Sequence, residues 1–148
     1  TIHTNSAWGT IPRLIDMGIP SYLLAQILNL TVAQRLVRLL CPYCKEKKTF
    51  DPTILPQSIK LNNLPEYYYV PMGCKECYFT GYKGRKAIYE VILIDSDLSN
   101  RIKLSHGDTK KIFEEKGILS LSQAALNIFF EGSTSIDEIY SILIGNQN

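Results

Sequence analysis

The stretch GCKECYFTGYKGR at residues 73–85 contains two cysteines separated by two residues, followed by a loop rich in glycine, tyrosine and basic residues. The only other cysteines, Cys41 and Cys44, have the same spacing as Cys74 and Cys77. A two-residue gap lets a tight turn point both sulfur atoms at one ion, and four thiolates complete the tetrahedral shell of a structural zinc site. The sequence therefore predicts Zn²⁺ bound by all four cysteines.

Two other uses of these cysteines fit the sequence less well. Disulfides need an oxidising compartment, and nothing in the sequence indicates one. Thiol–disulfide exchange favours a CxxC motif that opens a helix within a βαβ unit, whereas these motifs lie in a loop-rich stretch. Neither His3 nor His106 has ligand spacing with the cysteines. We therefore expect a closed structural site rather than a catalytic zinc.

The composition is that of a folded protein, with 148 residues, 45% of them hydrophobic, and a formal net charge of +2. This length predicts one domain, with two small lobes possible. The small net charge gives no general argument for nucleic-acid binding, although residues 1–50 carry six basic and two acidic side chains. The most apolar stretch, residues 22–40, is interrupted by amides and arginines, so we expect no transmembrane segment and a cytoplasmic location.

The N-terminal part predicts two short helices. A cap at residues 5–6 would open a first helix that closes at Gly18 and is kinked at Pro12, whereas a cap at Thr10 would place Pro12 in the first turn. A second helix is expected from Pro20 and Ser21 to about residue 29.

Strand patterns follow. Residues 31–40 predict a strand, and residues 85–94 predict a buried one. Between them, residues 41–84 contain all four cysteines and five of the seven prolines. We therefore expect a separate loop-rich module with one short strand at residues 67–70.

The remaining residues predict helices. Asp95 or Ser96 can cap a helix that ends near residue 104, and Asp108 can cap another that is closed by Gly117. Capping-box patterns at residues 120–123 and 135–138, separated by Gly132, predict two more. Their apolar faces are expected to be Leu121, Ala124, Ala125, Ile128 and Phe129, and Ile136, Ile139, Tyr140 and Leu143.

Common catalytic motifs are absent from the sequence, which has no GxxxxGK[ST], GxGxxG, GxSxG or HExxH. The residues alone therefore show no complete active site. His3 lies between an expected strand end and a helix start, where phosphate-sensing side chains occur, although a histidine there is more often structural. The opening residues TIHTN read as the middle of a domain, from which we expect a fragment of a longer protein.

Four stretches together resemble the C-terminal third of the secretion ATPases of type II secretion and type IV pilus assembly, the GspE/PilB class. IHTNSAWG resembles the end of that family's histidine box, and AQRLVRLLCPYC resembles the strand that enters its zinc module. GCKECYFTGYKGRKAIYEV resembles the exit from that module, and EGSTSIDEI resembles its terminal helices. The resemblance covers essentially the whole chain.

The resemblance implies a fold and an activity. The fold would be part of a P-loop, RecA-like α/β sheet with a tetracysteine zinc module and a C-terminal helical cap. The Walker A loop, the aspartate box and Walker B of the family lie upstream of its histidine box, so this chain alone should not hydrolyse ATP. The intact protein would be a hexameric motor, using ATP and Mg²⁺, at the cytoplasmic face of the inner membrane, and would drive pilin or pseudopilin assembly with platform proteins.

The resemblance also implies roles for single residues. His3 would lie near the terminal phosphate of the nucleotide in the intact enzyme. Arg13 and Arg85 match family arginines and would support the nucleotide site or a subunit contact. As alternatives, Arg13 is a solvated helix residue, and Arg85 pairs with an acid such as Glu90 on the following strand. The four cysteines match the family's zinc ligands.

The predicted organisation has three segments. Residues 1–40 would end the ATPase core, residues 41–84 would form the zinc module, and residues 85–148 would form a strand and a helical subdomain. The alternative function is a zinc-ribbon-like module that binds single-stranded nucleic acid or protein, since residues 78–85 combine interleaved aromatic and basic side chains. We favour a turn shaped by glycines with its aromatic side chains packed over the zinc module, and a protein partner.

Overall fold

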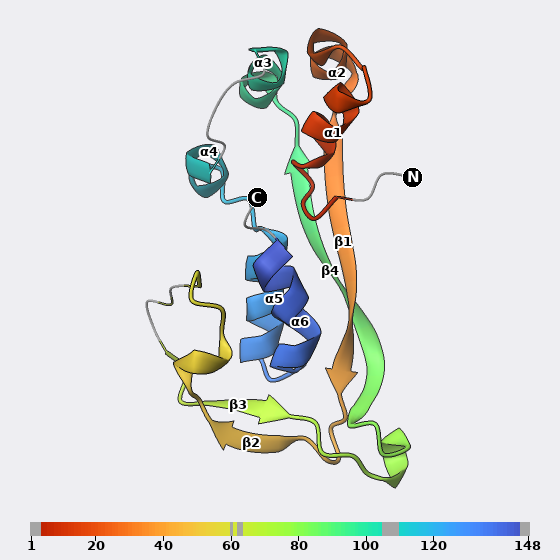
Figure 1. Cartoon of the computed structure of the whole chain (residues 1–148), viewed down its shortest axis with the longest axis vertical. Helices are drawn as coiled ribbons and strands as arrows, with labels where there is room; N and C mark the ends of the chain where they lie inside the picture. The colour runs from red at the N-terminus through yellow and green to blue at the C-terminus, as the bar shows by residue number, and fades with distance from the viewer. Residues whose placement is uncertain (1–3, 60, 62–63, 105–109, 146–148) are drawn as a thin grey trace. The chain divides into compact units, whose positions relative to one another are not determined.

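A computed structural model describes residues 4–59, 61, 64–104 and 110–145 (Figure 1). Within these residues, α-helices precede and follow a stretch that contains the four strands of two two-stranded sheets, which confirms the mixed α/β class. No helix in the described ranges is long and apolar enough to span a membrane. The elements are α1 Thr10–Asp16, α2 Ser21–Ile27, β1 Leu30–Leu40, β2 Glu46–Thr49, the 3₁₀ turn η1 Pro52–Ile54, β3 Tyr67–Val70, the 3₁₀ turn η2 Lys75–Cys77, β4 Tyr82–Leu93, α3 Ser96–Leu104, α4 Lys110–Glu115, α5 Leu121–Phe130 and α6 Ile136–Gly145.

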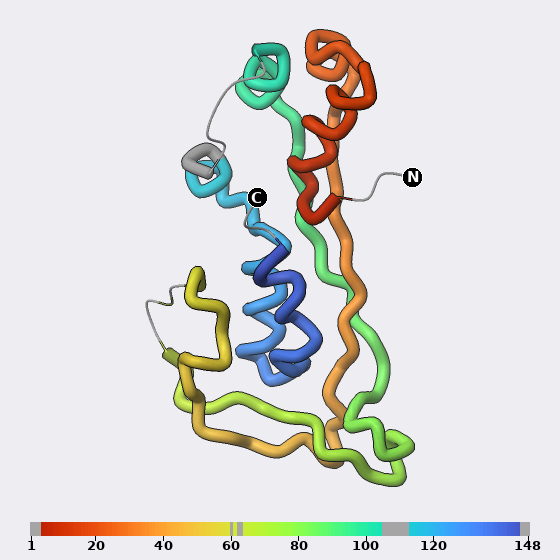
Figure 2. The backbone as a smooth tube through the Cα atoms, viewed as in Figure 1, coloured from red at the N-terminus to blue at the C-terminus, as the bar shows by residue number. Residues whose placement is uncertain are grey.

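The chain forms two compact units, each built from two separate stretches. Unit 1 contains residues 1–34 and 89–121, and unit 2 contains residues 35–88 and 122–148. The colours of the backbone in Figure 2 show early and late parts of the chain next to each other within each unit. Strands β1 and β4 pair with each other and run in opposite directions (Figure 1). The division into three successive segments stays a prediction.

Helix α1 settles the two alternatives for Pro12. The helix begins at Thr10 after Gly9 as its N-cap, one residue before the expected cap, so Pro12 lies in the first turn. There its missing N–H removes no hydrogen bond within the helix. Gly18 closes the helix as expected, with a φ of +91°.

The strands agree with the sequence patterns except at one place. β1 and β3 lie where they were predicted, and β4 begins three residues earlier than expected, at Tyr82. β2 was not predicted, because its sequence EKKT is exposed throughout and has no apolar alternation. It pairs antiparallel with β3, with Glu46 opposite Val70 and Thr49 opposite Tyr67.

The core of unit 1 lies where α1, α2 and α3 meet the paired strands. Trp8 and Ile94 pack against both of its buried clusters. The expected cap of α3 is confirmed, since the N–H of Leu98 donates to the Asp95 carboxylate at 3.0 Å. Asp108 lies outside the described residues. The buried residues of the clusters are Ala7, Ala33, Ile92 and Leu98, and Ile11, Leu24, Ala25 and Ile102.

The core of unit 2 centres on Phe129, which is fully buried against the ring of Tyr68. The turn between α5 and α6 comes close to β3, because a Cβ on Gly132 would lie 2.4 Å from the ring of Tyr69. The predicted face of α6 needs one correction. Tyr140 is 44% exposed, and Ile142 is buried in its place.

Candidate metal centre

The four cysteines come from two short turns in unit 2. Cys41 and Cys44 follow the end of β1, and Cys74 and Cys77 bracket η2 before β4 begins. The β2–β3 hairpin connects the two turns. Cys41 and Cys77 are buried, whereas Cys44 and Cys74 are half-buried. The structure thus brings together the four ligands that the sequence predicted.

The sulfur atoms are spaced as a tetrahedral metal requires. All four lie within 4.8 Å of one another. The Sγ–Sγ distances are 3.9 Å for Cys41 and Cys74, 3.8 Å for Cys44 and Cys77, and 3.8 Å for Cys74 and Cys77. A tetrahedron with Zn–S bonds of about 2.3 Å has sulfur atoms about 3.8 Å apart. The four thiols and these three distances therefore fit a tetrahedral Zn²⁺ site.

Backbone N–H groups point at two of the sulfur atoms. Gly73 donates to Sγ of Cys44 at 3.3 Å, and Cys74 and Gly81 each donate to Sγ of Cys77 at 3.2 Å. Such bonds stabilise thiolate charge and orient metal ligands.

The pKa values of two thiols are shifted in opposite directions. Burial raises the pKa of Cys44 to about 11, against one backbone hydrogen bond. Burial acts in the same sense on Cys77, but the N–H groups of Cys74 and Gly81, with the neighbouring thiols, outweigh it and lower the pKa of Cys77 to about 6. The pKa shifts therefore make the Cys77 thiol easier to ionise near neutral pH than the Cys44 thiol, and a bound cation would favour loss of protons from the cluster.

The loop that follows the second cysteine pair differs from the expectation in one respect. Gly81 and Gly84 shape it as predicted, with φ of +79° and +86°. Tyr78 and Phe79 do not pack over the cysteines, because they are 88% and 71% exposed. Of the three aromatic residues expected to cover the module, only Tyr82 is half-buried.

A network around Arg38 joins three of the stretches quoted above. The Arg38 guanidinium donates to the Glu138 carboxylate at 2.6 and 2.9 Å and lies 4.1 Å from the centre of the Tyr82 ring. The hydroxyls of Tyr82 and Ser135 are 2.7 Å apart. Thr134 donates to the backbone oxygen of Arg38. Sequence reasoning missed this network, which fastens the C-terminal helices to β1 and β4 within unit 2.

A buried carboxylate links distant stretches of unit 1. Glu90 is 4% exposed and accepts hydrogen bonds from the backbone N–H groups of Ala7 at 2.7 Å and Leu121 at 3.0 Å. These two bonds occupy its two oxygen atoms separately. This finding replaces the alternative in which Glu90 pairs with Arg85.

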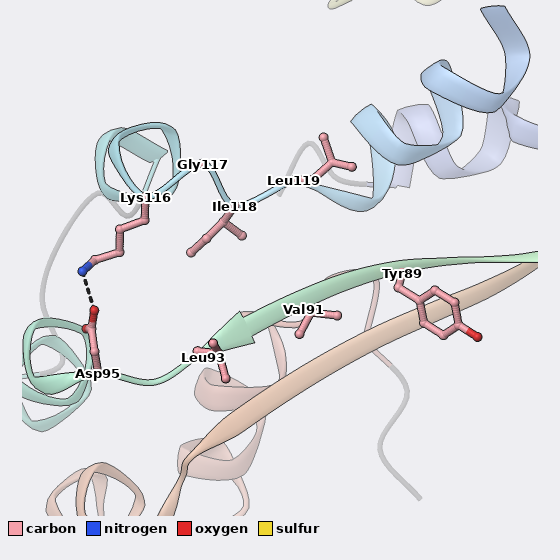
Figure 3. A pocket seen from close by; sticks show the side chains of 8 residues that line it. All are labelled: Tyr89, Val91, Leu93, Asp95, Lys116, Gly117, Ile118 and Leu119. Carbon is pink, nitrogen blue, oxygen red and sulfur yellow. Dashed lines mark hydrogen bonds and ion pairs between the residues drawn. The ribbon is translucent and has the colours of Figure 1, made fainter. Parts of the chain in front are cut away.

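Unit 1 also contains a hollow of about 540 Å³ beside β4 (Figure 3). An ion pair between Asp95 and Lys116 lies at one end of it, and the hydrogen bond from Lys116 holds the pKa of Asp95 below its ordinary value. None of the predicted site residues that the structure describes lines this hollow. Its lining consists of Tyr89, Val91, Leu93, Asp95, Lys116, Gly117, Ile118 and Leu119.

Of the other predicted site residues, Arg13 and Arg85 are not part of the cysteine cluster. His3 lies outside the described residues. Arg13 is exposed on α1 in unit 1. Arg85 is exposed on β4 in unit 2, where its charge adds to the stronger effect of Arg38 in lowering the pKa of Glu138.

Comparison with known proteins identifies the family. A family model described as "Type II/IV secretion system protein" matches residues 1–141. The chain belongs to this family. The resemblance seen in the sequence motifs is thereby confirmed for almost all of the 148 residues of the chain.

Curated relatives agree with the family match. The type IV pilus assembly ATPase PilB of Pseudomonas aeruginosa is 38% identical over 94% of this chain, and TfpB of Acinetobacter baylyi, also a type IV pilus assembly ATPase, is 36% identical over 97%. Type II secretion system protein E of Pectobacterium carotovorum is 37% identical over 96%. The chain covers 25%, 25% and 28% of these relatives, and therefore spans only about a quarter of their length.

Proposed function

We propose that the chain is the C-terminal part of a motor ATPase that powers pilin or pseudopilin assembly and protein export. The observation that carries this proposal is the family match over residues 1–141, together with relatives named as pilus assembly ATPases and type II secretion proteins. The motor would act as a hexamer at the cytoplasmic face of the inner membrane, with platform proteins as partners. Unit 1 would contribute to its RecA-like core.

The nucleotide site would depend on other parts of the same polypeptide. The chain contains no GxxxxGK[ST] motif to cradle phosphates, and its relatives are about four times as long. ATP and Mg²⁺ would therefore bind mainly outside this chain, which by itself should not hydrolyse ATP. His3 would approach the terminal phosphate, and Arg13 and Arg85 would support the nucleotide or a neighbouring subunit.

The cysteine cluster would hold a structural zinc ion. Sulfur spacing, the complete set of four thiols and the N–H groups aimed at Cys44 and Cys77 support this role. When bound, Zn²⁺ would supply a cross-link between the two turns. With four protein ligands, the site would keep no position open for a substrate.

A chimera tests the proposed function directly. In PilB of Pseudomonas aeruginosa, the quarter that aligns with this chain would be replaced by it, and ATP hydrolysis and zinc content would be measured on the purified chimera. We expect about one zinc per chain, a hexamer, and turnover well above that of the same chimera with its Walker A lysine replaced by alanine.

The outcomes separate the two parts of the proposal. A folded, zinc-loaded chimera that hydrolyses ATP no faster than its Walker A variant would contradict the motor function. A chimera that is active without any bound metal would contradict the zinc site alone. Turnover by the isolated chain of 148 residues would contradict the location of the nucleotide site.

A further inference from the structure

Strand β4 has an unpaired edge in unit 1. Its partner is β1, and no other strand among the described residues pairs with it. The N–H of Ile94 donates to the backbone oxygen of Asn29 at 2.9 Å, so the backbone groups of Ile94 point towards β1. Because alternate residues of a strand direct their N–H and C=O groups to opposite sides, those of Tyr89, Val91 and Leu93 point away from β1. This edge of β4 can therefore accept a further strand.

The hollow in unit 1 lies along the same edge. Ile118 packs against the buried cluster that contains Ile92, and it therefore lies on the buried face of the β1–β4 pair. The side chains of Tyr89, Val91 and Leu93 project from the opposite face and are 49%, 47% and 71% exposed. Figure 3 shows Ile118 on the side of β4 away from β1. A hollow lined from both faces therefore extends along the edge of β4 between them.

The hollow has the size and lining of a site for an extended peptide. Its volume of about 540 Å³ lies within the range of ligand pockets, about 300–1,000 Å³. The stretch of β4 that lines it, residues 89–93, spans about 14 Å of edge. Lysine or proline on an exposed edge blocks the addition of strands, and residues 89–93 contain neither. The edge is thus apolar and open to pairing.

One end of the hollow is acidic. Asp95 and Lys116 line this end, and Nζ of Lys116 also lies 3.4 Å from a carboxylate oxygen of Asp97. Two carboxylates and one ammonium leave a net charge of −1. The side chains of Asp95 and Asp97 are 45% and 70% exposed, against 30% for Lys116. A ligand with a cationic side chain would therefore meet complementary charge here.

We propose that the free edge of β4 in unit 1 binds an extended segment of a partner protein, which joins the sheet as a further strand inside the hollow. The segment carries apolar side chains and, next to Asp95 and Asp97, a lysine or arginine. Main-chain hydrogen bonds to Tyr89, Val91 and Leu93 supply affinity, and the apolar walls and the acidic end supply selectivity. This binding site goes beyond the proposed motor function and does not depend on the metal.

Fluorescence anisotropy on the purified chain tests the inference with a labelled, acetylated peptide, Lys-Val-Thr-Val-Thr-Val. Antiparallel pairing with β4 places its N-terminal lysine at the Asp95 end. We expect saturable binding, and binding weakened several-fold when glutamate replaces the lysine. The peptide Lys-Val-Pro-Pro-Thr-Val should bind about tenfold more weakly or worse, because in either register one of the two prolines removes an N–H that faces β4.

Two variants test the same edge from the side of the chain. Val91→Pro removes an N–H that points away from β1, a position where edge strands tolerate proline. Leu93→Lys places a cation on a largely exposed position near the acidic end. Each should weaken peptide binding by about tenfold or more, with little change in melting temperature. The matched control is Leu36→Lys, which alters a 62% exposed leucine of β1 that does not line the hollow and should bind as the wild type does.

Amide hydrogen exchange followed by NMR shows whether the edge is free. Without peptide, the amides of Tyr89, Val91 and Leu93 should exchange faster than those of Glu90 and Ile92, and the peptide should slow the first set. Slow exchange of the first set in the free chain would show that the edge is already covered, and would overturn the inference. Equal affinity for the two-proline peptide would overturn it as well.

Two further measurements separate a partner protein from other occupants. The PilB chimera should bind the peptide as the isolated chain does. Loss of binding in the chimera would show that the rest of the polypeptide covers the edge. Sedimentation of the chain should give a monomer, and a dimer that the peptide does not dissociate would show that a second copy occupies the edge. Either result overturns the binding of a partner protein.

Discussion

Gly81 lies at a crowded position between the second cysteine pair and β4. Its φ is +79°, and an added Cβ would lie 2.4 Å from Cβ of Pro71. We expect Gly81→Ala to destabilise the protein by about 3 kcal/mol, since a strained backbone conformation and overpacking both contribute. The substitution should also weaken zinc retention, because it disturbs the N–H that donates to Cys77. Denaturant unfolding and competition with a metal chelator measure the two effects.

Gly84→Ala is the control for that prediction. Gly84 has a similar φ of +86°, but its nearest neighbour to an added Cβ is a Leu39 carbon at 4.0 Å. In Gly84→Ala, only the strained backbone conformation should lower stability, by about 1 kcal/mol. Zinc retention should not change. Equal losses of stability in the two variants would show that close packing at Gly81 is not the cause.

Glu90 offers a second prediction for a single residue. Both carboxylate oxygens accept backbone N–H groups in a buried site. Glu90→Gln replaces one acceptor with an NH₂ group that faces a donor, which should cost about 1–3 kcal/mol. Urea unfolding measures the loss. Glu114→Gln, at an exposed position on α4, should change stability by less than about 0.5 kcal/mol. A Glu90→Gln variant with the same free energy of unfolding as the wild type would mean that the carboxylate is not required there.

The cysteines and Glu90 show what can be predicted for individual residues. The cysteine site could be predicted because ligand type and a two-residue spacing are local features of the sequence. Glu90 could not, because its partners lie 83 and 31 residues away along the chain. A glutamate in an apolar strand pattern carries no sign of which distant N–H groups it will meet.

At the scale of elements, the ion pair between Arg38 on β1 and Glu138 on α6 should make stability depend on pH. Hydrogen bonds from Arg38 lower the pKa of Glu138 below its ordinary value of 4.5. A carboxylate with a depressed native pKa stabilises the fold above its unfolded pKa, and this stabilisation is lost as the pH falls through the native pKa. Since half of the Arg38 side chain is exposed, we expect Glu138→Gln to cost only about 1 kcal/mol at pH 7.

Unfolding measured across pH checks this sign. The stability difference between wild type and Glu138→Gln should be constant above about pH 5 and should shrink below pH 4.5. Glu131→Gln is the control. Its ion pair with Lys86 has an N–O distance of 3.8 Å, and both side chains are at least half-exposed, so this substitution should change stability little at any pH. A loss in Glu138→Gln that persists at low pH would indicate a packing effect instead of a charge effect.

Elements were predictable where their pattern is apolar. Aromatic and β-branched residues predict β3 and β4, and Gly18 predicts the end of α1 because glycine tolerates a positive φ. β2 has no such signal, because a four-residue exposed strand is held by its partner and not by its own side chains. Tyr140 was misassigned on α6 for a related reason, since helical spacing alone does not decide which edge of an apolar face is buried.

At the scale of the whole molecule, contacts connect stretches that are far apart in sequence. Unit 2 joins the cysteine turns to α5 and α6, and Lys45 donates to the backbone oxygen of Gly132 at 2.7 Å. Unit 1 likewise joins the first 34 residues to residues 89–121. The sequence suggests three successive segments because composition changes along the chain, and composition contains no information on long-range pairing.

This organisation predicts where removal of the metal acts. Loss of Zn²⁺ would remove the cross-link between the two cysteine turns, so these turns and the β2–β3 hairpin that connects them should open. Unit 1 has its own buried clusters around Ile92 and Ile102 and no cysteine, so its amides should remain protected. Hydrogen exchange read out by mass spectrometry, before and after treatment with a strong chelator, measures both units at once.

The distribution of faster hydrogen exchange along the chain shows which unit the metal stabilises. If zinc stabilises unit 2 alone, exchange should accelerate most in residues 41–50 and 67–86, less in α5 and α6, and not in unit 1. Equal acceleration in α1 to α3 would mean that the two units unfold together and that the metal stabilises the entire chain. Unchanged exchange throughout would mean that the aromatic packing around Phe129 holds unit 2 without any metal.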